Sequence, residues 1–163
     1  MALEVNQRMP IESESDRVLL FGISMPIALA TSPMRFAHGK TVPDRLWLMS
    51  SDAMKFTIRR TGSNHMEILS EKGMINEIEQ SVRNLSREPL QEGQVIKTDG
   101  LQLEVASLDD AGHPTKLGLQ LDPDHMDDMV LISWTGKEFQ RNALPDVGSE
   151  LVLNLGVGVP SPQ

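Results

Sequence analysis

The stretch VIKTDGLQLEVASLDDAGHPTKLGLQL, residues 95–121, decides the fold class of this chain. Its segment 101–105 alternates apolar residues with polar Gln102 and Glu104, which is the period of a strand with one buried face. Residues 116–121 repeat the alternation with three leucines. Asp99-Gly100 and the segment 109–114 are rich in turn-forming residues. Together with an expected strand at 94–97, the stretch predicts an antiparallel meander, whose leucine face the rest of the chain must cover.

The rest of the chain continues this spacing of short strands and turns. Residues 54–60 and 65–70 alternate around a turn at 61–64, which predicts a hairpin. Further strands are expected at 18–23, 46–49, 129–134, 138–141 and 151–155. The pattern predicts an all-β or mainly β fold, either an antiparallel β-sandwich or a partly open barrel, with at most one short helix. That helix is expected at 76–85, although an extended crossing strand fits the same residues.

The predicted organisation is one β domain at 17–155, a flexible N-terminal leader at 1–16 and a flexible tail at 156–163. Residues 18–30, VLLFGISMPIALA, are the most apolar run and are too short to span a bilayer as a helix. We expect a buried strand, then an irregular segment with Pro26, then a loop at 31–43. A signal peptide is the alternative, because Ala28-Leu29-Ala30 is typical of a cleavage site. The acidic residues before the run and Pro26 within it argue against that alternative.

Composition and charge exclude some classes of function. The chain has 163 residues, with 15 Lys and Arg against 23 Asp and Glu, for a net charge of -8. It therefore lacks the basic face that a nucleic-acid-binding protein uses to contact phosphates. The absence of cysteine excludes disulfides and thiolate chemistry. It leaves the location open between the cytoplasm and the periplasmic or extracytoplasmic face of a membrane. Scarce aromatic residues and ten methionines indicate an aliphatic core.

Several glycine, proline and apolar positions carry a resemblance to a known group. These are Gly93-x-x-Ile96, Gly100-Leu101-x-Leu103-x-Val105, Gly112-x-Pro114-Thr115, Leu131-x-x-Trp134-x-Gly136, Pro145 and Gly148. Over roughly residues 16–153 the chain resembles the soluble C-terminal β-rich domain of uncharacterised bacterial multi-pass membrane proteins. The resemblance implies an extramembrane location and brings no catalytic motif. No run long enough to span a bilayer precedes these residues in this sequence, so the resemblance leaves membrane association open.

The acidic segment Asp122-Pro123-Asp124-His125-Met126-Asp127-Asp128 is the best candidate for a metal site. Asp122, Asp124, His125 and Asp128 offer hard oxygen and imidazole ligands that a divalent cation would accept. The segment departs from the EF-hand pattern, because Met126 occupies a ligand position and no glutamate closes the loop. A solvated turn between two strands explains the same residues and is the preferred interpretation, without a cofactor.

No catalytic residue can be assigned from the sequence. The four histidines, His38, His65, His113 and His125, lack the spacing of zinc motifs. No serine lies in a G-x-S-x-G elbow, and Gly156-Val157-Gly158 does not precede a helix. The sequence therefore favours a domain that is not an enzyme.

The predicted function is a non-catalytic accessory or protein-interaction domain, which could be the extramembrane part of a membrane-associated system. We expect residues 129–134 to offer an open sheet edge to a protein partner or to another copy of the chain, with Ile132 and Trp134 as contact residues. Two alternatives stay open. One is a metal-dependent enzyme or binder centred on residues 122–128, and the other is a carrier of a small apolar ligand.

Overall fold

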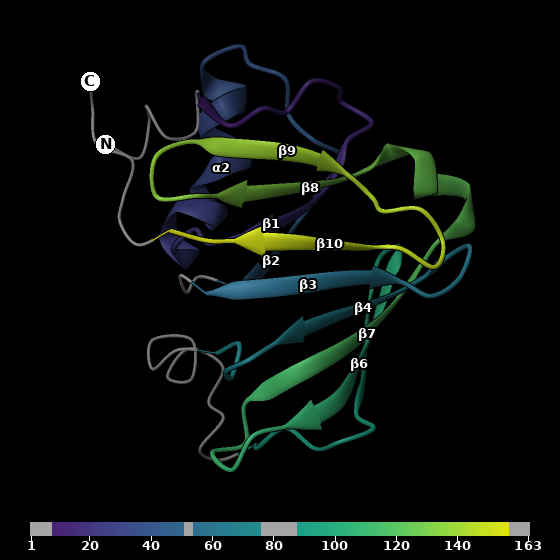
Figure 1. The fold of residues 1–163 in the computed structure, drawn as a ribbon. Coiled ribbons are helices and arrows are strands. Elements are labelled where there is room, and N and C mark those ends of the chain that lie inside the picture. The colour runs from purple at the N-terminus through teal and green to yellow at the C-terminus, as the bar shows by residue number, and fades with distance from the viewer. Residues whose placement is uncertain (1–7, 51–53, 76–87, 157–163) are drawn as a thin grey trace. The chain divides into compact units, whose positions relative to one another are not determined.

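The computed structural model describes residues 8–50, 54–75 and 88–156 (Figure 1). Its contacts divide the chain into two compact units, the first within residues 1–53, 128–143 and 155–163 and the second within 54–127 and 144–154. The boundaries of the domain expected at 17–155 coincide with neither unit. Strand periodicity locates strands but does not say which of them share a sheet, and here strands distant in sequence pair with one another.

The first unit contains a four-stranded sheet in the order β2-β1-β8-β9. Its strands are β1 (Arg17–Phe21), β2 (Arg45–Ser50), β8 (Met129–Trp134) and β9 (Phe139–Ala143). β1 is parallel to both of its neighbours, β2 and β8, whereas β8 and β9 are antiparallel. Parallel neighbours need a long crossover connection, and helix α2 (Met25–Ala37) provides it between β1 and β2. The antiparallel architecture expected from the sequence is therefore wrong for this sheet.

Helix α2 occupies residues for which the sequence predicts irregular structure and a loop. Pro26 misled the prediction, because a proline in the first turn of a helix blocks no hydrogen bond. Pro33 lies inside the helix and removes one backbone bond. Packing compensates, because Ile27, Ala28, Thr31 and Arg35 recur at helical spacing and are buried. The expected loop at 31–43 is thus wrong as far as Ala37.

The core of the first unit lies between α2 and one face of the sheet. Ile27 and Ala28 of α2 belong to one buried cluster with Val18 and Leu20 of β1 and with Ile132 of β8. The opposite face of these strands is buried as well, since Leu19, Phe21 and Leu131 have no exposed surface. Strands buried on both faces are typical of parallel sheets and give continuous apolar runs rather than alternation.

Residues 9–16, part of the expected flexible leader, are packed into the first unit. Met9 and Ile11 are buried in the same core. Arg35 donates hydrogen bonds to the backbone carbonyl groups of Met9, at 3.1 Å, and Ile11, at 3.3 Å. Arg141 of β9 reaches both oxygens of the Asp16 carboxylate, at 2.7 and 3.0 Å. Two arginines thus hold this segment against the unit, through contacts that sequence periodicity does not reveal.

The second unit contains a six-stranded antiparallel sheet in the order β10-β3-β4-β7-β6-β5. Its strands are β3 (Lys55–Arg60), β4 (His65–Ser70), β5 (Val95–Thr98), β6 (Leu101–Leu108), β7 (Pro114–Leu121) and β10 (Glu150–Asn154). The predicted meander, now β5-β6-β7, and the predicted hairpin β3-β4 are both confirmed. The buried face carries mainly aliphatic side chains, among them Ile58, Ile68 and Leu119.

The mainly β class is confirmed by the described residues. They form two sheets with one helix of seven or more residues, and neither sheet closes into a barrel. A short 3₁₀ helix, η1 (Pro123–Asp128), precedes β8. The helix or strand expected at 76–85 lies outside the described residues, as does all but Gly156 of the expected tail.

Asp16 makes the stability of the first unit depend on pH. Burial raises the pKa of Asp16, but hydrogen bonds from the Arg141 side chain and from the N–H groups of Glu12 and Ser13 outweigh burial and lower it below 3.8. Because the folded pKa lies below the unfolded one, the carboxylate stabilises the fold at neutral pH. That stabilisation decreases once the pH falls to the ordinary carboxyl pKa of 3.8, and it is lost when the pH falls below the folded pKa.

Replacing Asp16 with asparagine is therefore expected to lower the free energy of unfolding at pH 7 by about 2–4 kcal/mol, because Arg141 loses its buried charged partner and keeps only Glu12, whose side chain is largely exposed. Urea denaturation of the wild type and of Asp16→Asn measures this difference, which should narrow steadily below about pH 5. Asp44→Asn is the control, because Asp44 is a more exposed partner of Arg17 and Arg45. A difference for Asp16→Asn that stays constant down to about pH 3 would contradict the assignment.

Candidate functional site

The acidic segment folds into η1 and the turn that precedes it. The Asp122 side chain accepts a hydrogen bond of 3.1 Å from the backbone N–H of Asp124, and the Asp122 carbonyl accepts one from the N–H of His125. Asp124 is exposed, and His125 and Asp128 are partly buried. Within the described ranges, no three His, Asp or Glu side chains are grouped so that they could hold a metal ion. The structure thus does not bring Asp122, Asp124, His125 and Asp128 together as ligands.

Strand β8 is an interior strand, so the prediction that residues 129–134 form an open edge is wrong. It pairs with β1 on one side and with β9 on the other. Ile132 is fully buried, and Trp134 is 1% exposed and packs against Phe139 with ring centroids 5.1 Å apart. Neither side chain is accessible to a partner. The physical reason is the burial of both faces of β8, which the unbroken apolar run MVLI, residues 129–132, already indicates.

Proline at position 132 is therefore expected to destabilise the fold rather than to test partner binding. It would remove a backbone donor from a strand paired on both sides and replace a fully buried side chain. Loss of the side chain alone should lower the free energy of unfolding by about 2–5 kcal/mol. Ile132→Val is the control and should lose about 0.5–1.5 kcal/mol, as measured by urea denaturation. If Ile132→Pro and the wild type had the same urea concentration at the midpoint of unfolding, the assignment of β8 as an interior strand would be wrong.

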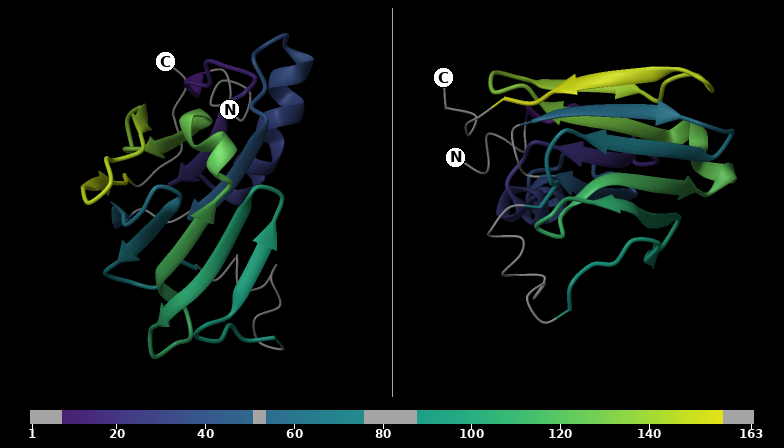
Figure 2. Two further views of the ribbon diagram at one scale, coloured as in Figure 1. Left: turned by 90° about the vertical axis from the view of Figure 1, so that its right-hand side faces the viewer. Right: turned by 60° about the horizontal axis from the view of Figure 1, so that its bottom comes forward.

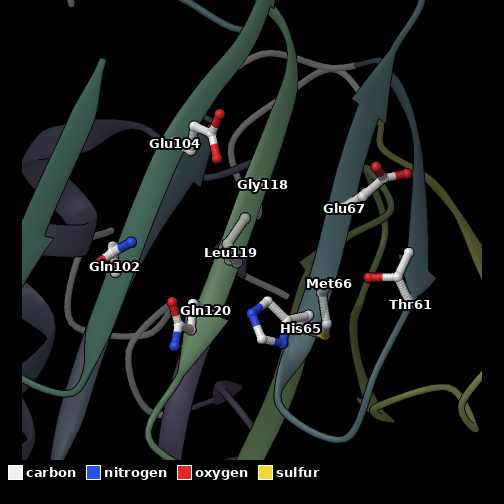
Figure 3. Close-up of a pocket in the computed structure, with 9 residues that line it drawn as sticks. All are labelled: Thr61, His65, Met66, Glu67, Gln102, Glu104, Gly118, Leu119 and Gln120. Atoms are coloured by element: carbon white, nitrogen blue, oxygen red, sulfur yellow. The ribbon is translucent and has the colours of Figure 1, made fainter. Parts of the chain in front are cut away.

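An open hollow of about 210 Å³ lies on the polar face of the second sheet (Figure 3). Strand register arranges its side chains in two rows. His65, Gln120 and Gln102 lie opposite one another across β4, β7 and β6. The next row has Glu67, Gly118 and Glu104. Thr61, Met66 and Leu119 complete the lining.

The chemistry of this hollow is polar. Lys116 lies 2.6 Å from one carboxylate oxygen of Glu67, and Arg59 lies 3.7 Å from the other, so the charge of Glu67 is balanced by neighbours on its own sheet. Gly118 leaves a gap in the layer of side chains, and a Cβ there would lie 3.7 Å from Glu104 without crowding. The hollow can exchange hydrogen bonds with a hydrophilic group. It does not have the apolar lining that the carrier hypothesis needs.

The outer face of α2 is defined by Pro26, Leu29, Pro33 and Phe36, all of which are exposed. Leu29 is 73% exposed and Phe36 is 81% exposed, the two highest values among the exposed large apolar side chains. In Figure 2, left, α2 (blue) has one side turned away from the strands of its own unit. The helix contains no Asp, Glu or Lys, and its one charged residue, Arg35, is buried. The helix thus presents apolar side chains to water without any charged residue among them.

This surface could have been recognised in the sequence. A run of thirteen residues with one charge, whose apolar positions surround the helix axis, is typical of a helix that is covered on all sides. Pro26 and Pro33 instead favour irregular structure in a sequence-based prediction, and an irregular segment has no outer helix face.

Comparisons with protein-family models, with curated proteins and with solved structures gave no match to this chain. The resemblance to C-terminal domains of bacterial membrane proteins therefore stays a prediction. None of the helices within the described ranges combines the length and the hydrophobicity that crossing a bilayer requires.

Proposed function

We propose that this chain is a protein-association domain and that the outer face of α2 is its docking surface. One observation carries the proposal: two large apolar side chains, Leu29 and Phe36, lie exposed on one helix face with no charge between them. Single exposed apolar side chains are common on proteins, whereas an apolar stripe along a helix is typical of an interaction site. The proposal keeps the class of function expected from the sequence and moves the contact from β8 to α2.

The arrangement of side chains on α2 supports this assignment over a purely structural role. The helix already contributes Ile27, Ala28, Thr31 and Arg35 to the interior of its own unit, so folding of the unit does not use the outer face. Burying a side chain such as leucine or phenylalanine gains about 1.5–3 kcal/mol for each residue, before the costs of association. Leu29 and Phe36 can therefore stabilise a complex without stabilising the free chain.

The hollow on the second sheet offers less support for a function. Its side chains are those of an ordinary solvated sheet face, and Glu67 is occupied by Lys116 and Arg59. The exposed apolar face of α2 is less common on protein surfaces than a polar sheet face, so it is the stronger indication of a binding site. Helices that dock by one apolar face are a recurring mode of recognition, in which anchors at positions three and four residues apart enter a groove or meet another helix.

The first test is that charge on the outer face should leave folding unchanged. Leu29→Glu and Phe36→Glu are expected to change the free energy of unfolding by less than about 0.5 kcal/mol, because both side chains are exposed in the free chain. Ile27→Glu is the contrasting variant, since Ile27 is buried in the core and its replacement should unfold the unit. Thermal and urea denaturation of dilute protein measure all three. A large loss of stability in Leu29→Glu would show that the outer face serves folding.

The second test locates the partner. A photo-crosslinking amino acid is placed at position 29 or 36, and in control proteins at position 147 or 152, where Val147 and Val152 are exposed apolar residues of the second unit. In the native host, positions 29 and 36 are expected to give one discrete product that mass spectrometry identifies, and positions 147 and 152 are expected not to give it. Equal and diffuse labelling from all four positions would refute the proposed docking surface.

A further inference from the structure

The apolar residues of the outer face of α2 follow the spacing of a helix pair. Pro26, Leu29, Pro33 and Phe36 are separated by three, four and three residues. Residues alternately three and four positions apart form a single straight seam along a helix, as in coiled coils. The seam is about 15 Å long, since each residue advances the helix by about 1.5 Å. A second helix laid along it could therefore contact all four side chains at once.

The seam is also symmetric about position 31. Pro26 and Phe36 are each five residues from this position, and Leu29 and Pro33 are each two residues from it. If a second copy of α2 lies antiparallel across a twofold axis at this point, Phe36 of one copy meets Pro26 of the other. Leu29 likewise meets Pro33. Every contact then joins a large side chain to a proline. A parallel pair would instead place Phe36 against Phe36 and Pro26 against Pro26.

Charge is compatible with this pairing. The whole chain has a net charge of -8, which opposes contact between two copies over most of its surface. The outer face of α2 brings no like charges together, because α2 contains no acidic residue and its arginine is buried. Antiparallel packing also places the positive end of each helix dipole beside the negative end of the other. Twofold contacts of this self-complementary kind are the commonest in soluble oligomers.

We infer that the partner docked on the outer face of α2 is a second copy of this chain, paired antiparallel with the twofold axis at position 31. This inference rests on the proposed docking surface and names its occupant. A contact made by one 13-residue helix from each copy is small, so the dimer is expected to be weak and to form reversibly with concentration.

The test uses the absence of cysteine from the chain. Two single-cysteine proteins of different mass, Pro26→Cys and Phe36→Cys, are mixed at high concentration in a thiol–disulfide buffer. In an antiparallel pair, position 26 of one copy is adjacent to position 36 of the other. Two copies of position 36 are about 15 Å apart along the helix, beyond the reach of a disulfide. We therefore expect the mixed disulfide between the two proteins and no disulfide dimer of Phe36→Cys alone.

Two controls accompany this experiment. Val152→Cys places the thiol on an exposed position of the second unit and should give no specific dimer. Adding Leu29→Glu to both cysteine variants should abolish the mixed disulfide while the fold is kept. Sedimentation over a wide range of concentration should show a monomer–dimer equilibrium for the wild type and monomer for Leu29→Glu.

Three results would overturn the inference in distinguishable ways. A disulfide dimer of Phe36→Cys alone would indicate a parallel pair. A dimer that persists in Leu29→Glu would place self-association elsewhere on the chain. A wild type that stays monomeric at all concentrations, together with a discrete cross-link from positions 29 and 36 to a different protein, would refute self-pairing and leave the docking surface in place.

Discussion

The structure of the first unit depends on the parallel pairing of β1 with both β2 and β8. Parallel neighbours cannot be joined by a tight turn, so the chain must cross over between β1 and β2, and α2 makes this connection. The crossover brings Ile27 and Ala28 onto the sheet, where they complete the core with Val18, Leu20 and Ile132. It also leaves the other side of the same helix on the surface. The exposed outer face of α2, which we propose as the docking surface, thus follows from the sheet topology.

Much of the second sheet could be predicted from the sequence, because its strands have one polar and one apolar face. The alternation in 101–105 and 116–121 and the turn at Asp99-Gly100 identify β6, β7 and their connection without knowledge of the fold. In the first unit the sequence predicts all four strands, but it predicts neither helix α2 nor the parallel pairing of β1 with β2 and β8. β1 and β8 are buried on both faces, so they show no alternation, and pairing between segments more than a hundred residues apart leaves no local signal.

The candidate site was harder to predict than the fold. Residues 122–128 form a turn and a short 3₁₀ helix, and their acidic composition alone predicts ligands that the structure does not group. Trp134 lies in the core with Phe139, as an aromatic residue inside an apolar strand usually does. The informative signal was the scarcity of charge in residues 25–37. Pro26 and Pro33 argue against a helix in a sequence-based prediction, although Pro26 lies in the first turn, where proline is tolerated.

We propose that the outer face of α2 is covered when the protein functions. Hydroxyl-radical footprinting tests it most directly, by comparing oxidation of Leu29 and Phe36 in intact cells of the native host with oxidation in dilute purified protein. Val147 and Val152 provide the internal reference, since both are exposed and lie in the other unit. We expect Leu29 and Phe36 to be strongly protected from oxidation in cells, and the two valines to react equally in both samples. Equal oxidation of Leu29 and Phe36 in cells and in dilute solution would contradict it.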